Sequence, residues 1–251
     1  RIVLLCALCV DPTVQAQEIT APARGEIIGG HEAEPHSRPY MAHLLIQRAN
    51  KSRCGGFLVK PTVVLTAAHC QGESITVVLG AHNVSQWEPS QQVIPVQRQI
   101  PHPQYNSKTL NNDIMILQLS GKARLTRDVR LIRLTSRRRG VKLPTRCSVA
   151  GWGRTGLMDR TDILREVNLK VISDEVCREK FSNYVPSSML CAGDPDDRKS
   201  AYMGDSGGPL VCRGVVEGIV SFGDKNSIVP PAVYTRISHF LPWIKATLRG
   251  I

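Results

Sequence analysis

The chain has 251 residues, of which 42% are hydrophobic and 21% are charged. This content is sufficient to bury a full core, which argues against disorder and fits one large β domain or two small ones. The formal net charge is +11. An excess of basic residues of this size favours polyanions as binding partners. The alternative is a basic surface that contacts only water.

The first residues differ from the rest of the chain. Residues 2–10 form an apolar run, and the small-residue sequence Val14-Gln15-Ala16 follows it. The run is too short to span a bilayer, and the arrangement is typical of a secretory signal peptide. We expect a signal peptide at residues 1–16 whose start is incomplete, with a buried N-terminal strand as the alternative. No transmembrane segment is expected.

The cysteines indicate an oxidising compartment. Of eight cysteines, Cys6 and Cys9 lie in the predicted signal peptide, and none of the remainder forms a Cys-x-x-Cys pair with zinc-ligand spacing. Structural disulfides are therefore expected among these six, although the spacing leaves their connectivity open. The six are Cys54, Cys70, Cys147, Cys177, Cys191 and Cys212.

Short apolar or alternating segments separated by turn signals dominate the chain from residue 37 onward. They cover residues 41–46, 55–59, 63–65, 75–79 and 114–119, and then 146–151, 166–171, 209–212, 215–222 and 233–237. This spacing predicts an all-β chain. Residues 239–248 show helical periodicity, with Phe240, Ile244 and Leu248 on one face, and they predict a C-terminal helix.

The stretch Gly204-Asp205-Ser206-Gly207-Gly208-Pro209 has the composition of a nucleophile turn. Flanking glycines allow the backbone to aim two N–H groups at one point beside the Ser206 hydroxyl. A hydroxyl is a weak nucleophile at neutral pH, so it needs a general base and a group that orients the base. The candidates are His69, in Thr66-Ala67-Ala68-His69-Cys70, and Asp113, in Asn112-Asp113-Ile114-Met115.

The other potential ligands do not form a metal motif. No His-Glu-x-x-His or comparable cluster occurs, so we expect neither a metal nor a cofactor. The remaining histidines are interpreted as surface residues or as core residues with satisfied hydrogen bonds. They are His31, His36, His43, His82, His102 and His239.

The order His69, Asp113, Ser206 resembles that of the chymotrypsin-like serine proteases, and the resemblance covers residues 27–251. It narrows to the granzyme, chymase and cathepsin G branch through four motifs. These are Ile27-Ile28-Gly29-Gly30-His31-Glu32-Ala33, Pro35-His36-Ser37-Arg38-Pro39-Tyr40-Met41-Ala42, Leu79-Gly80-Ala81-His82-Asn83 and Phe240-Leu241-Pro242-Trp243-Ile244-Lys245. The resemblance implies an all-β fold of two six-stranded antiparallel β-barrels with a C-terminal α-helix. The barrels would cover roughly residues 27–130 and 131–236, and the helix residues 238–249.

The resemblance also implies roles for individual residues. His69 would take the Ser206 proton and later donate it to the leaving amine, while Asp113 would hold the other ring nitrogen. The N–H groups of Gly204 and Ser206 would form the oxyanion hole. Removal of a propeptide at residues 17–26, which ends in Gly-Glu, would free the α-amino group of Ile27 to pair with Asp205. The implied disulfides are Cys54–Cys70, Cys147–Cys212 and Cys177–Cys191.

By the same resemblance, Ser200, Gly223 and Ala232 would form the specificity pocket. None of the three adds a charge, and Gly223 would leave the entrance open to a flat ring. An uncharged, roomy pocket rewards the burial of apolar side chains. We therefore expect cleavage after Phe, Tyr and Leu, with Met as a further candidate. The acidic residues Asp194, Asp196 and Asp197 are interpreted as surface.

Residues beside the pocket would contact the substrate further along its chain. Ser221, Phe222 and Gly223 would pair with the substrate backbone as a short antiparallel strand, and Ser221 would also donate to Asp113. Leu110 and Met203 would neighbour adjacent substrate side chains.

The expected partners are protein or peptide substrates, an anionic heparin-like proteoglycan and serpin-type inhibitors, and the protein is expected to be a monomer. Nucleic acid is disfavoured because no aromatic stacking platform accompanies the arginine cluster, which consists of Arg133, Arg137, Arg138 and Arg139. The expected location is outside the cell or in a secretory granule of an immune cell. Asn50 and Asn83 begin N-glycosylation acceptor sequences. A catalytically silent cationic binding protein is the alternative, which the intact triad disfavours.

Overall fold

The computed structural model describes residues 30–136, 141–153, 161–193, 201, 204–224 and 229–251. Several predicted features lie outside these residues: the signal peptide, the propeptide, Ile27, Ser200 and Met203. Three arginines of the predicted cluster and the acidic residues at 194, 196 and 197 also lie outside them.

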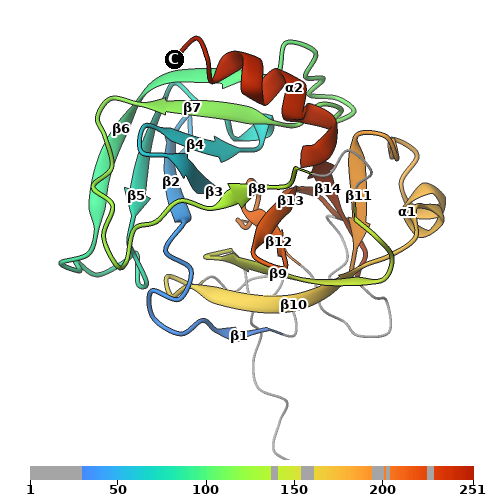
Figure 1. Ribbon diagram of the computed structural model, residues 1–251, viewed down its shortest axis with the longest axis horizontal. Coiled ribbons are helices and arrows are strands. Elements are labelled where there is room, and N and C mark those ends of the chain that lie inside the picture. Colours follow the sequence, from blue (N-terminus) through green and yellow to red (C-terminus); the bar gives the residue numbers. More distant parts are fainter. Residues whose placement is uncertain (1–29, 137–140, 154–160, 194–200, 202–203, 225–228) are drawn as a thin grey trace, which may run out of the picture.

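Six antiparallel strands in the first half of the chain close into a barrel (Figure 1). They are β2 (Met41–Gln47), β3 (Ser52–Lys60), β4 (Val63–Thr66), β5 (Ser74–Leu79), β6 (Gln92–Pro101) and β7 (Met115–Leu119). The order around the barrel is β2-β3-β4-β7-β6-β5. The barrel closes because β2 pairs with both β3 and β5, which leaves no free edge among the six strands.

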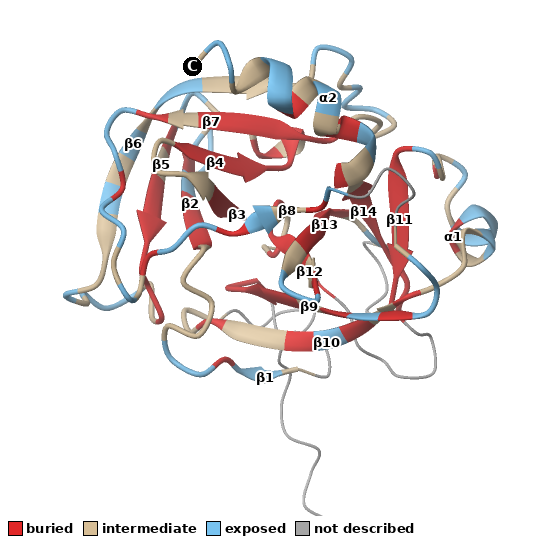
Figure 2. Cartoon of the chain, in the orientation of Figure 1, coloured by how far each residue is buried: buried red, intermediate tan, exposed pale blue. Residues whose placement is uncertain are grey.

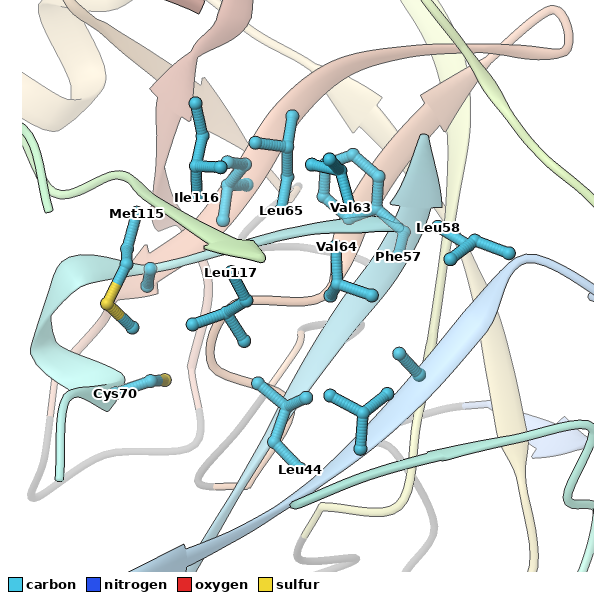
Figure 3. Packing of buried hydrophobic residues seen from close by; sticks show 14 of the residues in the cluster. Leu44, Phe57, Leu58, Val63, Val64, Leu65, Cys70, Met115, Ile116 and Leu117 are labelled. Carbon is cyan, nitrogen blue, oxygen red and sulfur yellow. The ribbon is translucent and has the colours of Figure 1, made fainter. Parts of the chain in front are cut away.

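The interior of the first barrel is filled by the apolar positions that the sequence pattern indicated. Figure 3 shows Leu44, Phe57, Val64, Leu65 and Leu117 gathered between the strands, and all five are fully buried. Each such side chain stabilises the fold by about 2 kcal/mol through the apolar area that it removes from water. In Figure 2 the buried colour covers β4 and most of β7, whereas β6 is largely exposed or half-buried.

The second half of the chain forms another closed ring of six antiparallel strands. They are β9 (Thr145–Gly151), β10 (Arg165–Val171), β11 (Met189–Ala192), β12 (Pro209–Cys212), β13 (Val215–Phe222) and β14 (Ala232–Arg236). The ring closes because β10 pairs with β9 as well as with β11. Two short strands extend this sheet: β1 (His31–Glu32) pairs with β10, and β8 (Arg133–Leu134) lies parallel to β13. The predicted fold of two six-stranded antiparallel barrels is confirmed.

Three short helices complete the described fold. A 3₁₀ helix, η1 (Ala68–Cys70), follows β4, and α1 (Asp174–Lys180) begins after Ser173, whose hydroxyl caps it by accepting from the Glu175 N–H. The C-terminal helix α2 (Ile237–Thr247) lies beside β7 (Figure 1). Its Phe240 and Ile244 are buried against the core of the first barrel. This helix confirms the predicted C-terminal element and ties the end of the chain to its first half.

Three further features of the described residues bear on the sequence predictions: the disulfides, the length and apolarity of the helices, and the exposure of two asparagines. The structure joins Cys54 to Cys70, Cys147 to Cys212 and Cys177 to Cys191, the pairs that the resemblance implied. No helix in the described part of the chain combines the length and apolarity that crossing a bilayer requires. Asn50 is exposed, and Asn83 is half-buried in a turn where its Oδ1 accepts from the backbone N–H of Ser85.

Candidate active site

Each of the three predicted catalytic residues lies at the end of a strand. His69 is in η1, directly after β4, and Asp113 is in the chain that leads into β7. Ser206 lies in the turn before β12. Because β4 and β7 are hydrogen-bonded neighbours in the first barrel and β12 belongs to the second, the site forms where the two barrels meet.

Asp113 is held by three hydrogen bonds around a fully buried carboxylate. Its Oδ2 lies 2.7 Å from His69 Nδ1, and its Oδ1 accepts from the His69 backbone N–H at 2.9 Å. Ser221 Oγ donates to Oδ2 at 2.5 Å. The three donors pair both oxygens of the buried carboxylate, as a buried polar group requires. This arrangement fixes the orientation of the imidazole and leaves Nε2 for proton transfer.

Two further side-chain contacts hold the backbone at Asp113 and at Gly55 in β3. Thr235 Oγ1 donates to the Asp113 carbonyl at 2.7 Å, and Thr66 Oγ1 donates to the Gly55 carbonyl at 2.8 Å. Neither threonine was predicted as a site residue, because their roles depend on strand pairing between distant segments. The only available signal was a hydroxyl-bearing residue in a candidate strand, for Thr235, or directly after one, for Thr66.

The backbone around Ser206 connects the two barrels. Its carbonyl accepts from the Gly55 N–H of β3 at 2.7 Å, and the Gly207 N–H donates to the Val220 carbonyl of β13 at 2.8 Å. Gly204 and Gly207 have φ values of +104° and +82°, in the region that glycine adopts most easily. A Cβ on Gly207 would lie 2.1 Å from Thr66 Oγ1, so this position requires glycine.

Ser206 and His69 line the same cleft, which has a volume of about 330 Å³. No hydrogen bond joins their side chains in the part of the chain that the structure describes. Catalytic hydrogen bonds are often long in the absence of substrate and shorten when the reactive complex forms. The chemistry that this constellation supports is acyl transfer to the Ser206 hydroxyl, with His69 as the base.

Comparisons with known proteins agree with this geometry. Residues 27–244 match the protein family named Trypsin. The chain belongs to the trypsin family. It is 55% identical to duodenase-1 of Bos taurus over 99% of this chain and 96% of that protein. It is 54% identical to human cathepsin G over 92% and 91% of the two chains, and 50% identical to human granzyme B over 99% and 98%.

A solved structure titled "Structure of GrC" matches this trypsin-family chain with a TM-score of 0.85. The two are 46% identical over 88% of this chain and 99% of the other. These similarities identify a serine protease of the granzyme and cathepsin G type. The alternative of a non-enzymatic binding protein is therefore not supported.

The cleft of this trypsin-family protease is mainly apolar. Gly223 and Ala232, two predicted pocket residues, both line it, whereas Ser200 lies outside the described residues. Ala232 is only 3% exposed, and its Cβ lies 3.7 Å from the place that a Cβ on Gly223 would occupy. Any side chain at position 223 would therefore narrow the opening beside Ala232.

Other lining residues come from strands and turns near the pocket. Val220, Ser221 and Phe222 at the end of β13 all line the cleft. Leu110 also lines it, in a left-handed conformation with φ of +56°. Asp224 was not predicted as a lining residue, although its position directly after Gly223 was an available signal.

Asp205, the predicted partner of the Ile27 amino group, is completely buried. Its Oδ1 accepts from the Gly153 N–H at 2.9 Å. A Cβ on Gly151 would lie 2.1 Å from that same oxygen, so the backbone packs closely around the carboxylate. Because Ile27 lies outside the described residues, the ion pair between them stays a prediction.

The described residues contain one cluster with metal-ligand spacing, which consists of Cys54, His69 and Cys70. Both sulfurs belong to one disulfide and are not thiolates, and thiolates are the form of cysteine that binds metal ions. The cluster therefore does not fit a metal ion.

Proposed function

We propose that this serine protease cleaves peptide bonds after Phe, Tyr and Leu, with Met as a further candidate. The observation that carries the proposal is the apolar cleft beside His69 and Ser206, where Ala232 is buried and uncharged. Burial of an aromatic side chain there would contribute about 2 to 3 kcal/mol. No lysine or arginine among the described residues lines this cleft to attract an acidic side chain.

The mechanism proposed is acylation of Ser206. The Ser206 hydroxyl attacks the substrate carbonyl while His69 takes its proton, and Asp113 stabilises the resulting imidazolium. The N–H groups of Gly204 and Ser206 stabilise the oxyanion, and each such donor contributes about 3 kcal/mol in the transition state. His69 then protonates the leaving amine, and water releases the acyl group by the same steps in reverse order.

Among the described residues that line the cleft, Asp224 is the acidic one. It follows Gly223 in the chain, after the segment that would pair with the substrate backbone. Asp224 already has an interaction partner. We therefore assign it no part in selecting a basic residue at the cleaved position.

Activation is proposed to occur by removal of residues 17–26. The positive charge of the new Ile27 amino group would lie beside the buried carboxylate of Asp205, and opposite charges attract more strongly in the protein interior than in water. The contact of Asp205 with Gly153 connects this event to the neighbouring backbone. The relatives named granzyme B and cathepsin G support a location in a secretory granule or outside the cell. The three disulfides fit an oxidising compartment. A serpin-type inhibitor is the proposed regulator. An anionic proteoglycan is the proposed storage partner.

The test uses two forms of the chain, one beginning at Ile27 and one beginning at Gly25. Each is assayed on a peptide library with every residue at the cleaved position. We expect the Ile27 form to prefer Phe, Tyr and Leu, and the Gly25 form to be slower by about 100-fold, which corresponds to roughly 3 kcal/mol. Preference for Lys or Asp would contradict the specificity, and equal rates for the two forms would contradict the activation.

A further inference from the structure

Arg48 follows β2 directly and contacts the backbone of the proposed base. Its Nη2 donates to the His69 carbonyl at 2.7 Å, and its Nε donates to the Gln71 carbonyl at 2.7 Å. The N–H groups of a guanidinium lie in a rigid planar fork, so one arginine can hold two carbonyls of the same turn. The side chain is half-buried. These two bonds connect the end of β2 to the residue that takes the Ser206 proton in the proposed mechanism.

The His69 carbonyl lies at the end of η1, where backbone donors are no longer available. The backbone hydrogen bonds of this turn end on the carbonyls of Ala67 and Ala68. The last carbonyls of a helix have no donor within the helix, and arginine side chains near its end can satisfy them. Arg48 does so with a charged donor, and hydrogen bonds from charged groups are about twice as strong as those between neutral groups.

Both backbone groups of His69 are therefore bound by charged side chains from other segments. The His69 N–H donates to Asp113 Oδ1 at 2.9 Å, while its carbonyl accepts from Arg48 at 2.7 Å. The ring contacts the same carboxylate through Nδ1. Because a misplacement of about 1 Å in an active site can cost about 100-fold in rate, the bond at the carbonyl bears directly on where the ring stands.

The charge of Arg48 lies in the surroundings of the catalytic residues. Burial raises the pKa of Tyr105 to about 12, with a further contribution from the negative charge of Asp113 and an opposing one from the positive charge of Arg48. Both charges thus act on one half-buried tyrosine. The guanidinium belongs to this neighbourhood rather than to a distant part of the surface.

A second side chain holds the same segment three residues after His69. Gln99 of β6 donates from Nε2 to the Gly72 carbonyl at 2.8 Å, and its Oε1 accepts from the Gly72 N–H at 3.1 Å. A Cβ on Gly72 would lie 2.4 Å from Ile46, so the backbone is closely packed there. Gln99 makes two hydrogen bonds, as Arg48 does, but they end on Gly72 and not on His69. It is a matched comparison for the effect of holding the segment alone.

We propose that Arg48 is a positioning residue for His69, which it holds in the place that proton transfer from Ser206 requires. The inference rests on the proposed role of His69 as the base. The alternative is that Arg48 stabilises the fold without any effect on catalysis. The two differ in kinetics, because loss of a positioning contact lowers kcat and kcat/KM together while KM stays the same.

The first experiment compares Arg48→Met and Gln99→Met in the Ile27 form. Arg48→Met should lower kcat for a peptide substrate about tenfold and change KM by less than about twofold. Gln99→Met should lower kcat by less than about twofold. Both should lower the melting temperature by about 2–5 °C, because each removes two hydrogen bonds. An equal fall in kcat in the two variants, or no fall in Arg48→Met, would overturn the proposal.

Two more variants separate hydrogen bonding from charge. Arg48→Lys keeps the charge but lacks the planar fork, so its kcat should lie about threefold below wild type. A lysine variant no faster than Arg48→Met would overturn the claim that donation to the carbonyl is what Arg48 supplies. If Arg48→Met does not fold, the comparison of Arg48→Lys with Gln99→Met decides. Arg124→Met removes an equal charge from an exposed position outside the cleft; a fall in kcat equal to that of Arg48→Met would overturn the proposal.

A spectroscopic measurement follows the ring itself. The His69 Nδ1 proton is bound by Asp113 over a distance of 2.7 Å between the heavy atoms, and such a proton resonates far downfield in the proton NMR spectrum. In Arg48→Met it should broaden through faster exchange with water, and in Gln99→Met it should match wild type. An unchanged resonance in Arg48→Met would overturn the proposal. Ser206→Ala, assayed in parallel, tests the mechanism: hydrolysis at the wild-type rate would refute the proposed function, whereas full activity of Arg48→Met beside an inactive Ser206→Ala would refute only the role of Arg48.

Discussion

His43 on β2 predicts a loss of stability in acid. Its side chain is 3% exposed and lies edge-on against Trp152, with ring centroids 5.3 Å apart. Among the described residues, neither ring nitrogen has a hydrogen-bond partner. Burial, with a smaller contribution from the positive charge of Arg53, lowers the pKa of His43 from 6.5 to about 4, and Asp162 opposes this. The folded protein therefore resists protonation of this ring.

The sign and size of the effect follow from linkage. Because the unfolded chain binds a proton at His43 below pH 6.5 and the folded chain does so only near pH 4, stability is full above pH 6.5. It falls as the pH drops from 6.5 to 4. Between pH 7 and pH 5 the loss in the free energy of unfolding from this group is about 2 kcal/mol, and below pH 4 it reaches about 3 kcal/mol.

The assay is denaturant unfolding at pH 7 and pH 5 on the Ser206→Ala protein, in which the proposed nucleophile is removed to prevent self-digestion. His43→Phe keeps an aromatic ring against Trp152 and removes the titrating group, so the difference in unfolding free energy between the two pH values should shrink by about 2 kcal/mol. His43→Leu gives the same comparison if the larger ring overpacks. The exchange His239→Phe at an exposed position is the control. Parallel pH dependences in wild type and both His43 variants would refute the reasoning.

Three other substitutions test the site. Ser221→Ala removes the 2.5 Å hydrogen bond to Asp113 and should lower kcat/KM about tenfold with an unchanged circular dichroism spectrum; an unaltered rate would contradict a positioning role. Ala232→Glu should raise the rate of cleavage after Lys, relative to cleavage after Phe, at least about tenfold in peptides that differ only at that position. An unchanged ratio would show that residue 232 does not face the substrate. Gly207→Ala should destabilise the fold by about 3 kcal/mol or more and abolish hydrolysis. Gly214→Ala, also at positive φ but with open space, should cost only about 1 kcal/mol in denaturant unfolding.

The short apolar runs were sufficient to predict an all-β chain, and the resemblance to the chymotrypsin-like proteases implied the two barrels. β4 and β7 are almost entirely buried, so their composition alone marks them. β6 was not predicted, because Pro95 and Pro101 lie in it and few of its side chains are buried. Proline normally argues against a strand, and here pairing with β5 and β7 overrides that local preference.

Site residues could be predicted where they belong to a local motif or where the family resemblance assigns them a role. The glycines beside Ser206 are such a motif, and two of them have the positive φ expected of a tight turn. The hydrogen bond from Ser221 to Asp113 joins residues 108 positions apart and was implied by the resemblance. The Thr235 contact with Asp113 joins residues 122 positions apart, and no local pattern encodes it. His43 was interpreted as a surface residue or a satisfied core residue. It is instead a core histidine whose ring nitrogens lack partners within the described structure.

The central claim is that Ser206 is the nucleophile of a cleft that accepts an aromatic ring. Phenylmethylsulfonyl fluoride tests it directly, because its benzyl group would enter the cleft and its sulfur would react with an activated serine. Mass spectrometry of the Ile27 form should find one sulfonyl group per chain on the peptide containing Ser206, with hydrolysis lost in proportion to labelling. Labelling of another residue, or full hydrolysis by a fully labelled protein, would contradict the account.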